Sequence, residues 1–129
     1  KIKLYLDRKK IKYSDLGTYS KESVDASDYA AAVAKKVKKN KNDRGILICG
    51  SGVIMAIAAN RIKGIRASAV WHEVIAKQAR EHNNINILCL SGRERQPNNW
   101  KKIVDIFLKT KSLKKQKYKN RIKKLDLIK

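Results

Sequence analysis

The residues with the clearest chemical potential stand together at 49–52, which read Cys-Gly-Ser-Gly. The apolar run 45–50 leads into them, and the apolar, helix-like stretch 51–61 follows. Glycines let backbone N–H groups approach an oxyanion closely, and a helix N-terminus adds positive potential. That environment favours a thiolate, so Cys49 could act as a base or a nucleophile. A cysteine at a strand end is also a common inert core residue, and Gly-Ser-Gly also forms plain tight turns, so the pattern alone leaves both interpretations open.

A second group of candidate residues lies within 80–93. His82 and Asn83 stand where a helix should end, and Arg93 follows the next apolar run. Histidine transfers protons near neutral pH, and an asparagine amide can bind a sugar hydroxyl. A guanidinium after a strand is well placed to bind an anion. The alternative for His82 is structural, because the negative end of a helix favours a histidine cation.

These residues need elements to hold them, and hydrophobic periodicity predicts those elements. Short apolar runs bounded by glycines are typical of buried parallel strands, whereas apolar residues at helical spacing indicate helices. We expect strands at 11–16, 45–50, 65–70 and 84–90. We expect helices over 1–8, 28–39, 51–61, 72–82, 98–110 and 113–128, the second of them capped by Asp25 or Ser27.

Strands that alternate with helices predict an α/β fold. Right-handed crossovers then give a three-layer αβα sandwich around a doubly wound, Rossmann-like parallel sheet. At 129 residues the chain is expected to be one domain, 1–129. Ligands bind such sheets beyond the carboxyl ends of the strands. The segments 50–54, 70–73 and 91–95 follow three of the expected strands, so the sequence predicts a site there.

The charge balance is strongly basic, with 32 Lys and Arg against 11 Asp and Glu and a net charge of +21. This balance suits nucleic acid, an anionic surface or a phosphorylated small molecule. The charge is mostly lysine scattered along the chain, without an arginine-rich arm, a zinc finger or an aromatic RNA-binding motif. We therefore expect a solvated lysine surface and a small anionic substrate, and not a nucleic acid partner.

The two cysteines lie outside any CxxC or metal-binding spacing, which indicates reduced thiols in a cytoplasmic protein. No metal or other cofactor is expected. No apolar run approaches the roughly 20 residues of a membrane helix, so no membrane partner is expected either.

Four long segments resemble the type B ribose-5-phosphate isomerases and the related galactose-6-phosphate isomerase subunits. The segments read DLGTYSKESVD, DRGILICGSG, MAIAANRIKGIRA and REHNNINILCLSGR, and the resemblance covers about residues 1–125. That family interconverts an aldose phosphate and a ketose phosphate through an enediolate, without a metal. The resemblance implies an enzyme of the pentose phosphate pathway that acts on ribose 5-phosphate and ribulose 5-phosphate.

The resemblance also implies roles for single residues. Cys49 would be the base that moves a proton between C2 and C1 of the sugar. Ser51 would help to open the sugar ring, His82 would be the acid–base partner in that step, and Asn83 would bind the sugar. Some relatives use a glutamate as base where this chain has Met55, which leaves Cys49 as the candidate.

The remaining implied roles concern negative charge on the substrate. The backbone at Gly50 and Gly52 would hold the enediolate oxygen, as an oxyanion hole does. Arg93 and Arg121 would bind the phosphate, together with Lys117, which stands where the family usually has arginine. Lysine keeps the charge but lacks the bidentate fork of a guanidinium.

In this family a second subunit completes the site. A homodimer or a dimer of dimers is therefore implied, and the basic helix at 113–128 would contribute to the site of its partner.

The sequence departs from the family pattern in three places. The family begins with a strand and an Asp-His loop that this chain lacks, so we expect more sequence before Lys1. Ile54 replaces a glycine of the anion-binding loop, and a β-branched residue strains a backbone with positive φ. Trp71, His72 and Val74 also differ, and we expect His72 to lie at the rim of the site.

Two alternatives stay open. The substrate could be another sugar phosphate, such as galactose 6-phosphate or allose 6-phosphate. The chain could also be a non-catalytic basic paralogue that binds nucleic acid, which the +21 charge and Ile54 would favour.

Overall fold

The computed structural model describes residues 1–93 and 97–129. Within them, the strands β1 (Gly45–Cys49), β2 (Ala67–Ala69) and β3 (Ile87–Ser91) form a parallel sheet in the order β1-β3-β2. The registers pair Cys49 of β1 with Ser91 of β3, and Ala67 of β2 with Ile87 of β3. The carboxyl ends of β1 and β3 therefore meet at one edge of the sheet.

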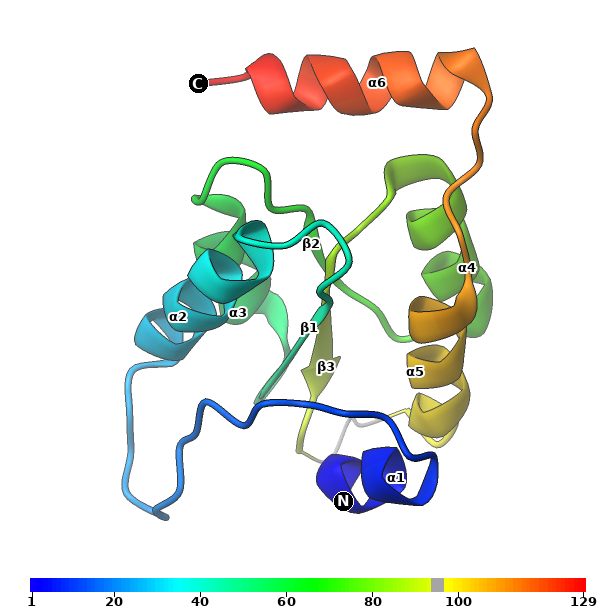
Figure 1. The fold of residues 1–129 in the computed structure, drawn as a ribbon. Helices are drawn as coiled ribbons and strands as arrows, with labels where there is room; N and C mark the ends of the chain where they lie inside the picture. The colour runs from blue at the N-terminus through cyan, green and yellow to red at the C-terminus, as the bar shows by residue number, and fades with distance from the viewer. Residues whose placement is uncertain (94–96) are drawn as a thin grey trace.

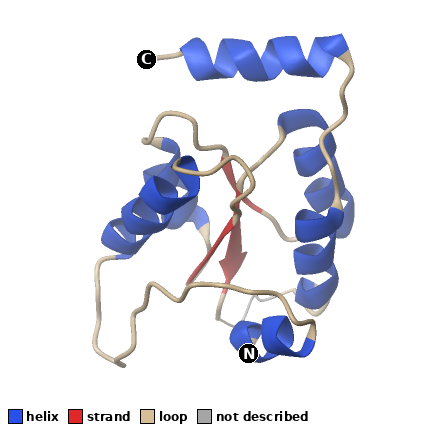
Figure 2. Cartoon of the chain, viewed as in Figure 1, coloured by secondary structure: helices blue, strands red, loops and turns tan. Residues whose placement is uncertain are grey.

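Helices cover both faces of this sheet (Figures 1 and 2). On one face, α2 (Ala26–Lys38) and α3 (Val53–Asn60) bury an apolar cluster with Leu47, Ile87 and Cys89. On the other, α1 (Ile2–Arg8), α4 (Glu73–Asn83) and α5 (Trp100–Lys109) bury a second cluster with Leu88 and Leu90. Alternate residues of β3 thus pack into the clusters on opposite faces of the sheet, which explains why the sequence of β3 is continuously apolar. The prediction of an αβα sandwich with a parallel sheet is confirmed.

The helices that connect parallel strands run back against them, so their C-termini gather where the strands begin. The last helix, α6 (Gln116–Leu127), lies across this same edge, whereas α1 lies near the opposite one (Figure 1). We call the two ends of the sheet the amino edge and the carboxyl edge. No helix in the described ranges is long and apolar enough to cross a membrane.

The strand predicted at 11–16 is wrong, because the structure gives this segment no strand. A strand needs a neighbour for its backbone N–H and C=O groups, and within the described residues none lies beside it. Side-chain contacts hold the segment instead: the Asp15 carboxylate accepts hydrogen bonds from Lys3 Nζ at 2.8 Å and from the Gly17 N–H at 3.0 Å. The other predicted elements are present with shifted ends, most clearly β3, which begins at Ile87.

Two helix starts depend on single side chains. Asp25 caps α2 by accepting a hydrogen bond from the Ser27 N–H at 3.2 Å, so Asp25 and not Ser27 is the cap. His72 caps α4, because its Nδ1 accepts a hydrogen bond from the Val74 N–H at 3.1 Å. Both side chains satisfy a backbone donor that a helix N-terminus leaves free.

Candidate active site

Cys49 ends β1 and is half-buried where the chain turns into α3. The Gly52 N–H donates a hydrogen bond to the Cys49 Sγ at 3.1 Å. The Val53 N–H donates to the Ser51 Oγ at 3.2 Å. The first backbone donors of α3 thus point at the thiol and the hydroxyl. The thiolate is the form of cysteine that can remove a proton.

Glycine at position 52 is required by both conformation and space. Gly52 has φ +82°, in the left-handed region that side chains rarely adopt. A Cβ there would lie 3.2 Å from the carbonyl carbon of Leu90, so the loop packs directly on the β3 backbone. Ile54 lies inside α3 with an exposed side chain, and the strain expected at this residue is not found.

Ser91 fastens the ends of β1 and β3 together. Its side chain is buried, and its Oγ donates to the Gly50 carbonyl at 2.7 Å. The Gly92 N–H donates to the Cys49 carbonyl at 2.8 Å. Sequence reasoning missed Ser91; the available signal was a small hydroxyl side chain at the end of an otherwise apolar strand.

The second cysteine differs sharply from the first. Cys89 is 1% exposed, inside the core between the sheet and α2 and α3. Burial, and to a smaller extent the nearby Cys49, raise the pKa of the Cys89 thiol to about 12. Cys89 therefore stays protonated at neutral pH and cannot serve as a base. Of the two thiols, only Cys49 combines partial exposure with a donor on its sulfur.

Arg93 completes this set at the carboxyl edge. A Cβ on Gly50 would lie 3.5 Å from Arg93 Nε, so the guanidinium arm lies over the loop that carries the thiol. We call Cys49, Gly50, Ser51, Gly52 and Arg93 the carboxyl-edge group. The structure brings together these five predicted site residues, whereas 94 and 95 of the predicted segment 91–95 lie outside the described residues.

The other predicted site residues gather at the amino edge. The His82 ring stacks on Tyr118 of α6, with ring centroids 4.6 Å apart and planes 6° from parallel. Lys117 Nζ and Arg121 Cζ lie 4.9 and 5.8 Å from the centre of the same Tyr118 ring. Asn83 follows His82 and is exposed. We call His82, Asn83, Lys117 and Arg121 the amino-edge group. Tyr118, which contacts His82, Lys117 and Arg121, was not predicted.

A buried arginine fixes the chain that enters α6. Arg80 is 3% exposed, and it donates hydrogen bonds to the Thr110 carbonyl at 3.0 Å and to Asn84 Oδ1 at 2.8 Å. The Leu113 N–H also donates to the Glu81 carbonyl at 2.9 Å. Hydrogen bonds therefore hold the connection between α5 and α6 against the last turn of α4, next to His82.

The two groups do not meet within one chain. Cys49 lies at the carboxyl edge, and His82 lies at the far end of α4, beside the residues that start β3. The 11 residues of α4 span about 16 Å at 1.5 Å per residue. His82 therefore cannot come within hydrogen-bonding reach of the same chain's Cys49.

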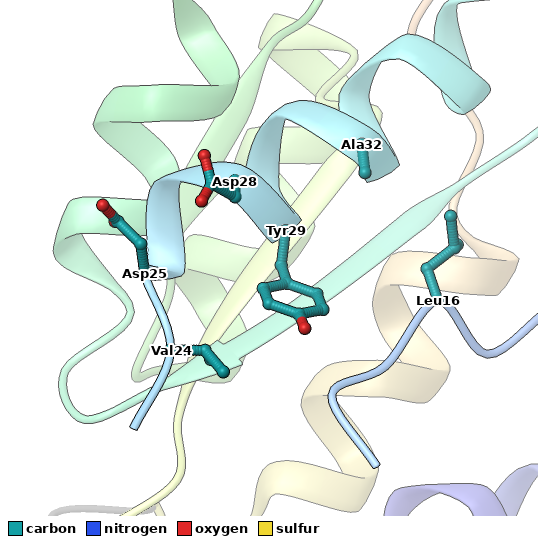
Figure 3. A pocket seen from close by; sticks show the side chains of 6 residues that line it. All are labelled: Leu16, Val24, Asp25, Asp28, Tyr29 and Ala32. Carbon is teal, nitrogen blue, oxygen red and sulfur yellow. The ribbon is translucent and has the colours of Figure 1, made fainter. Parts of the chain in front are cut away.

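Two surface depressions of the chain are lined by residues other than Cys49. One, of about 390 Å³, lies between α2 and the coil before it and is lined by Leu16, Val24, Asp25, Asp28, Tyr29 and Ala32 (Figure 3). Another, of about 470 Å³, follows α4 from Glu73 to His82. Cys49 lines neither of these two depressions.

A family model described as Ribose/Galactose Isomerase matches residues 1–125. The chain belongs to the ribose/galactose isomerase family. Membership agrees with the resemblance found in the sequence, and the match extends over both the carboxyl-edge group and the amino-edge group.

Individual members of the family agree with this assignment. The chain is 47% identical over 110 residues to a Mycoplasma genitalium protein named probable ribose-5-phosphate isomerase B, with 84% of this chain and 72% of that protein covered. It is 39% identical over 107 residues to ribose-5-phosphate isomerase B of Escherichia coli, covering 83% and 72%. A ribose 5-phosphate isomerase structure from Thermotoga maritima matches with a TM-score of 0.92 at 46% identity, covering 98% of this chain and 87% of that one.

Proposed function

We propose that the protein is an aldose–ketose isomerase that interconverts ribose 5-phosphate and ribulose 5-phosphate, with Cys49 as the base. The observation that carries the proposal is the half-buried Cys49 sulfur, which accepts the Gly52 N–H at the start of α3. Family membership supplies the reaction, and this geometry supplies a thiol suited to proton transfer.

In the proposed reaction, the Cys49 thiolate removes the proton from C2 of the open-chain aldose. The electron pair left on carbon forms the C1–C2 double bond of an enediolate, and negative charge develops on the oxygen. The donors at the start of α3 and the positive end of the helix stabilise that charge. The C1 oxygen gains a proton and the C2 hydroxyl loses one, so the negative charge moves to the C2 oxygen. The same thiol then returns the carbon-bound proton to C1, the C2 oxygen becomes the carbonyl, and the ketose forms without any change of oxidation state overall.

The amino-edge group supplies the remaining functions. His82 exchanges the proton that opens the sugar ring, with help from the Ser51 hydroxyl, because imidazole transfers protons near neutral pH. The Asn83 amide binds a sugar hydroxyl. Lys117 and Arg121 bind the phosphate together with Arg93 from the carboxyl-edge group, since opposite charges attract strongly at close range.

A second subunit is needed to join the two groups. We propose a homodimer in which the amino-edge group of each subunit, including α6, meets the carboxyl-edge group of the other. Apolar side chains that a partner could cover are exposed on β1, on α3 and around the start of α4: Ile48, Val53, Ile54, Ile57, Trp71, Val74 and Ile75. A two-fold axis would create two equivalent sites.

We place the reaction in the pentose phosphate pathway of the cytoplasm. Ribose 5-phosphate and ribulose 5-phosphate are pentose phosphates, and the two free thiols suit a reducing compartment.

A six-carbon substrate such as galactose 6-phosphate is the second candidate, because the family description names both sugars. Trp71 and His72 are exposed after the carboxyl end of β2. Comparing kcat/KM for five-carbon and six-carbon aldose phosphates separates the two candidates.

The decisive experiment compares Cys49→Ala with the matched control Cys89→Ala. Loss of a general base lowers kcat by roughly 10²–10⁴-fold, so Cys49→Ala should almost abolish turnover. It should also stop the exchange of substrate carbon-bound hydrogen with D₂O, followed by NMR. Cys89→Ala removes a thiol that stays protonated, so it should keep both activities. Full exchange in Cys49→Ala would show that another group is the base.

A further inference from the structure

The exposed face of α2 carries its charges in an order that complements itself. Six exposed residues make up this face: Asp25 and Asp28 at the N-terminal end, Ala32 in the middle, and Lys35, Lys36 and Lys39 at the C-terminal end. Apart from Lys36, they follow one another at intervals of three and four residues, so they form one stripe along the helix. We call these six residues the α2 stripe. Its acidic half and its basic half lie at equal distances from Ala32.

The charges of the α2 stripe are not neutralised within the chain. In the part of the chain that the structure describes, no ion pair includes one of them. The opposite side of the helix is apolar, because Ala30, Ala34 and Val37 are buried in the cluster with Leu47 of β1. The stripe therefore points away from the sheet, and its acids and lysines can be paired only by something outside the chain.

The α2 stripe is separate from the contacts of the proposed homodimer. The apolar residues assigned to that interface lie on β1, on α3 and around the start of α4, and the amino-edge group lies on α4 and α6. The carboxyl-edge group lies on the turn from β1 into α3 and after β3. None of these residues belongs to α2, which lies at the left of Figure 1, away from α4 and α5.

We propose that α2 is a second self-association face, which packs antiparallel against α2 of a subunit in another dimer and so forms a dimer of dimers. A two-fold axis beside Ala32 places each residue opposite the one equally far from Ala32 in the other direction. Asp28 then meets Lys35 and Lys36 of the partner subunit, and Asp25 meets Lys39 of the partner subunit. The symmetry repeats every ion pair, so the charges that one chain leaves unpaired are paired by a second copy.

The shape of this face suits a helix as partner. Ala32, at the centre, is small, so two helices can approach closely there. The depression of about 390 Å³ lies beside the acidic half of the stripe, and Leu16, Val24 and Tyr29 give it an apolar lining (Figure 3). Lysine side chains cover apolar surface with their methylene groups while the ammonium group reaches a carboxylate. The depression therefore has both the lining and the charge to receive the lysines of a second α2.

The helix dipole offers a different explanation for the same order of charges. It favours acids in the first turn and lysines in the last turn of a single helix, without any partner. The two explanations differ in their consequences, because only the contact between copies makes the assembly depend on these charges.

Charge reversal in the full-length protein tests the contact. Asp28→Lys alone, or Lys35→Glu with Lys36→Glu, places like charges opposite each other, so each variant should halve the native mass from four chains to two in sedimentation velocity. All three substitutions together restore opposite charges in exchanged places and should restore four chains, which also shows that the substituted helix folds. Lys1→Glu with Lys12→Glu is the control: it lowers the net charge by four, as the reversal of two stripe lysines does, and should keep four chains.

Wild-type protein with the mass of two chains, reversal variants that keep four chains, or a combined variant that stays at two would each overturn the proposal. None of the substituted residues belongs to either site group, so isomerase activity is measured separately and the proposed function can fail independently of this contact.

Cross-linking tests the register of the two helices. Because Ala32 lies beside the proposed axis, two copies of Ala32→Cys should be adjacent and should form an intersubunit disulfide under mild oxidation, seen as a covalent dimer on a non-reducing gel. Lys38→Cys is the control on the same helix: its two copies would lie about 18 Å apart along the helices, too far for a disulfide, which needs Cα atoms within about 7 Å. Equal cross-linking of the two variants, or none in Ala32→Cys, would overturn the antiparallel contact.

Discussion

The two ends of the sheet are built in different ways. At the carboxyl edge, backbone and short side chains are held by close contacts: Gly52 packs on the backbone of β3, and Ser91 fixes the carbonyl of Gly50. At the amino edge, Lys117 and Arg121 are long, exposed side chains on a helix. Proton transfer requires atoms placed within a fraction of an ångström, whereas attraction of a phosphate tolerates much looser placement. The rigid end suits the chemistry, and the charged end suits the capture of the substrate.

The largest expected effect comes from mixing two inactive variants. This experiment tests whether the carboxyl-edge group of one subunit meets the amino-edge group of the other. Cys49→Ala and His82→Asn should each be nearly inactive alone. When their subunits are denatured together and refolded, random pairing in a two-fold dimer should restore about a quarter of the wild-type sites, because half of the dimers are mixed and each has one intact site. The measurement is specific activity against mixing ratio. No recovery would mean that each site is built within one chain.

Substituting Gly52 tests the rigidity of the carboxyl edge. Gly52→Ala combines a left-handed backbone with a contact to the Leu90 carbonyl carbon, so we expect about 2 kcal/mol of lost stability and a clear fall in kcat. Gly64→Ala is the matched control, because Gly64 has φ +87° but nothing within 4 Å of a Cβ. It should cost about 1 kcal/mol and leave kcat unchanged. Urea unfolding and steady-state kinetics measure both; equal costs would argue against the close packing at Gly52.

Replacing Lys117 tests whether phosphate binding at the amino edge tolerates looser placement of side chains than proton transfer does. Lys117→Arg should lower KM, since a guanidinium binds phosphate through two hydrogen bonds, and Lys117→Ala should raise it by roughly fivefold, about 1 kcal/mol. Neither change should alter kcat much, because the side chain holds the phosphate and not the reacting carbons. Lys119→Ala is the control on the same helix. A fall in kcat for Lys117→Ala with an unchanged KM would assign Lys117 to the chemical step.

Ser91→Ala should have the smallest effect. It removes the hydrogen bond to the Gly50 carbonyl and should cost about 1 kcal/mol in urea unfolding. Ser68→Ala, which removes a longer contact of 3.4 Å to the Ala69 carbonyl, should cost less. If Ser91→Ala were neutral, the ends of β1 and β3 would be held by their backbone bonds alone.

The features that the sequence predicts correctly are those that depend on residues close together in the sequence. The glycines that bound an apolar run predict the position of β1, and residues 49–52 predict the turn into α3. Both predictions are possible because the strand, turn and helix signals are contiguous in the sequence there. The carboxyl-edge group followed from the rule that ligands bind beyond strand ends. The strand expected at 11–16 failed for the opposite reason, since alternation describes a strand only when another strand lies beside it.

Two of the unpredicted features depend on partners that are distant in the sequence. Stacking of His82 on Tyr118 joins residues 36 positions apart, and the Ser91 hydroxyl meets a carbonyl 41 positions earlier in the chain. The capping role of His72 is local, but histidine is an uncommon cap and was interpreted as a rim residue.

The attachment of Arg80 to Thr110 has a consequence for substrate size. It fixes where α6 begins relative to His82, so the imidazole and the two phosphate-binding cations of α6, Lys117 and Arg121, belong to a single unit held at a constant separation. In the proposed reaction these groups bind opposite ends of the sugar. We therefore expect the five residues between Thr110 and Gln116 to influence the length of carbon chain that the site accepts. A longer sugar would be accommodated by altering that connection, without touching the thiol or its loop.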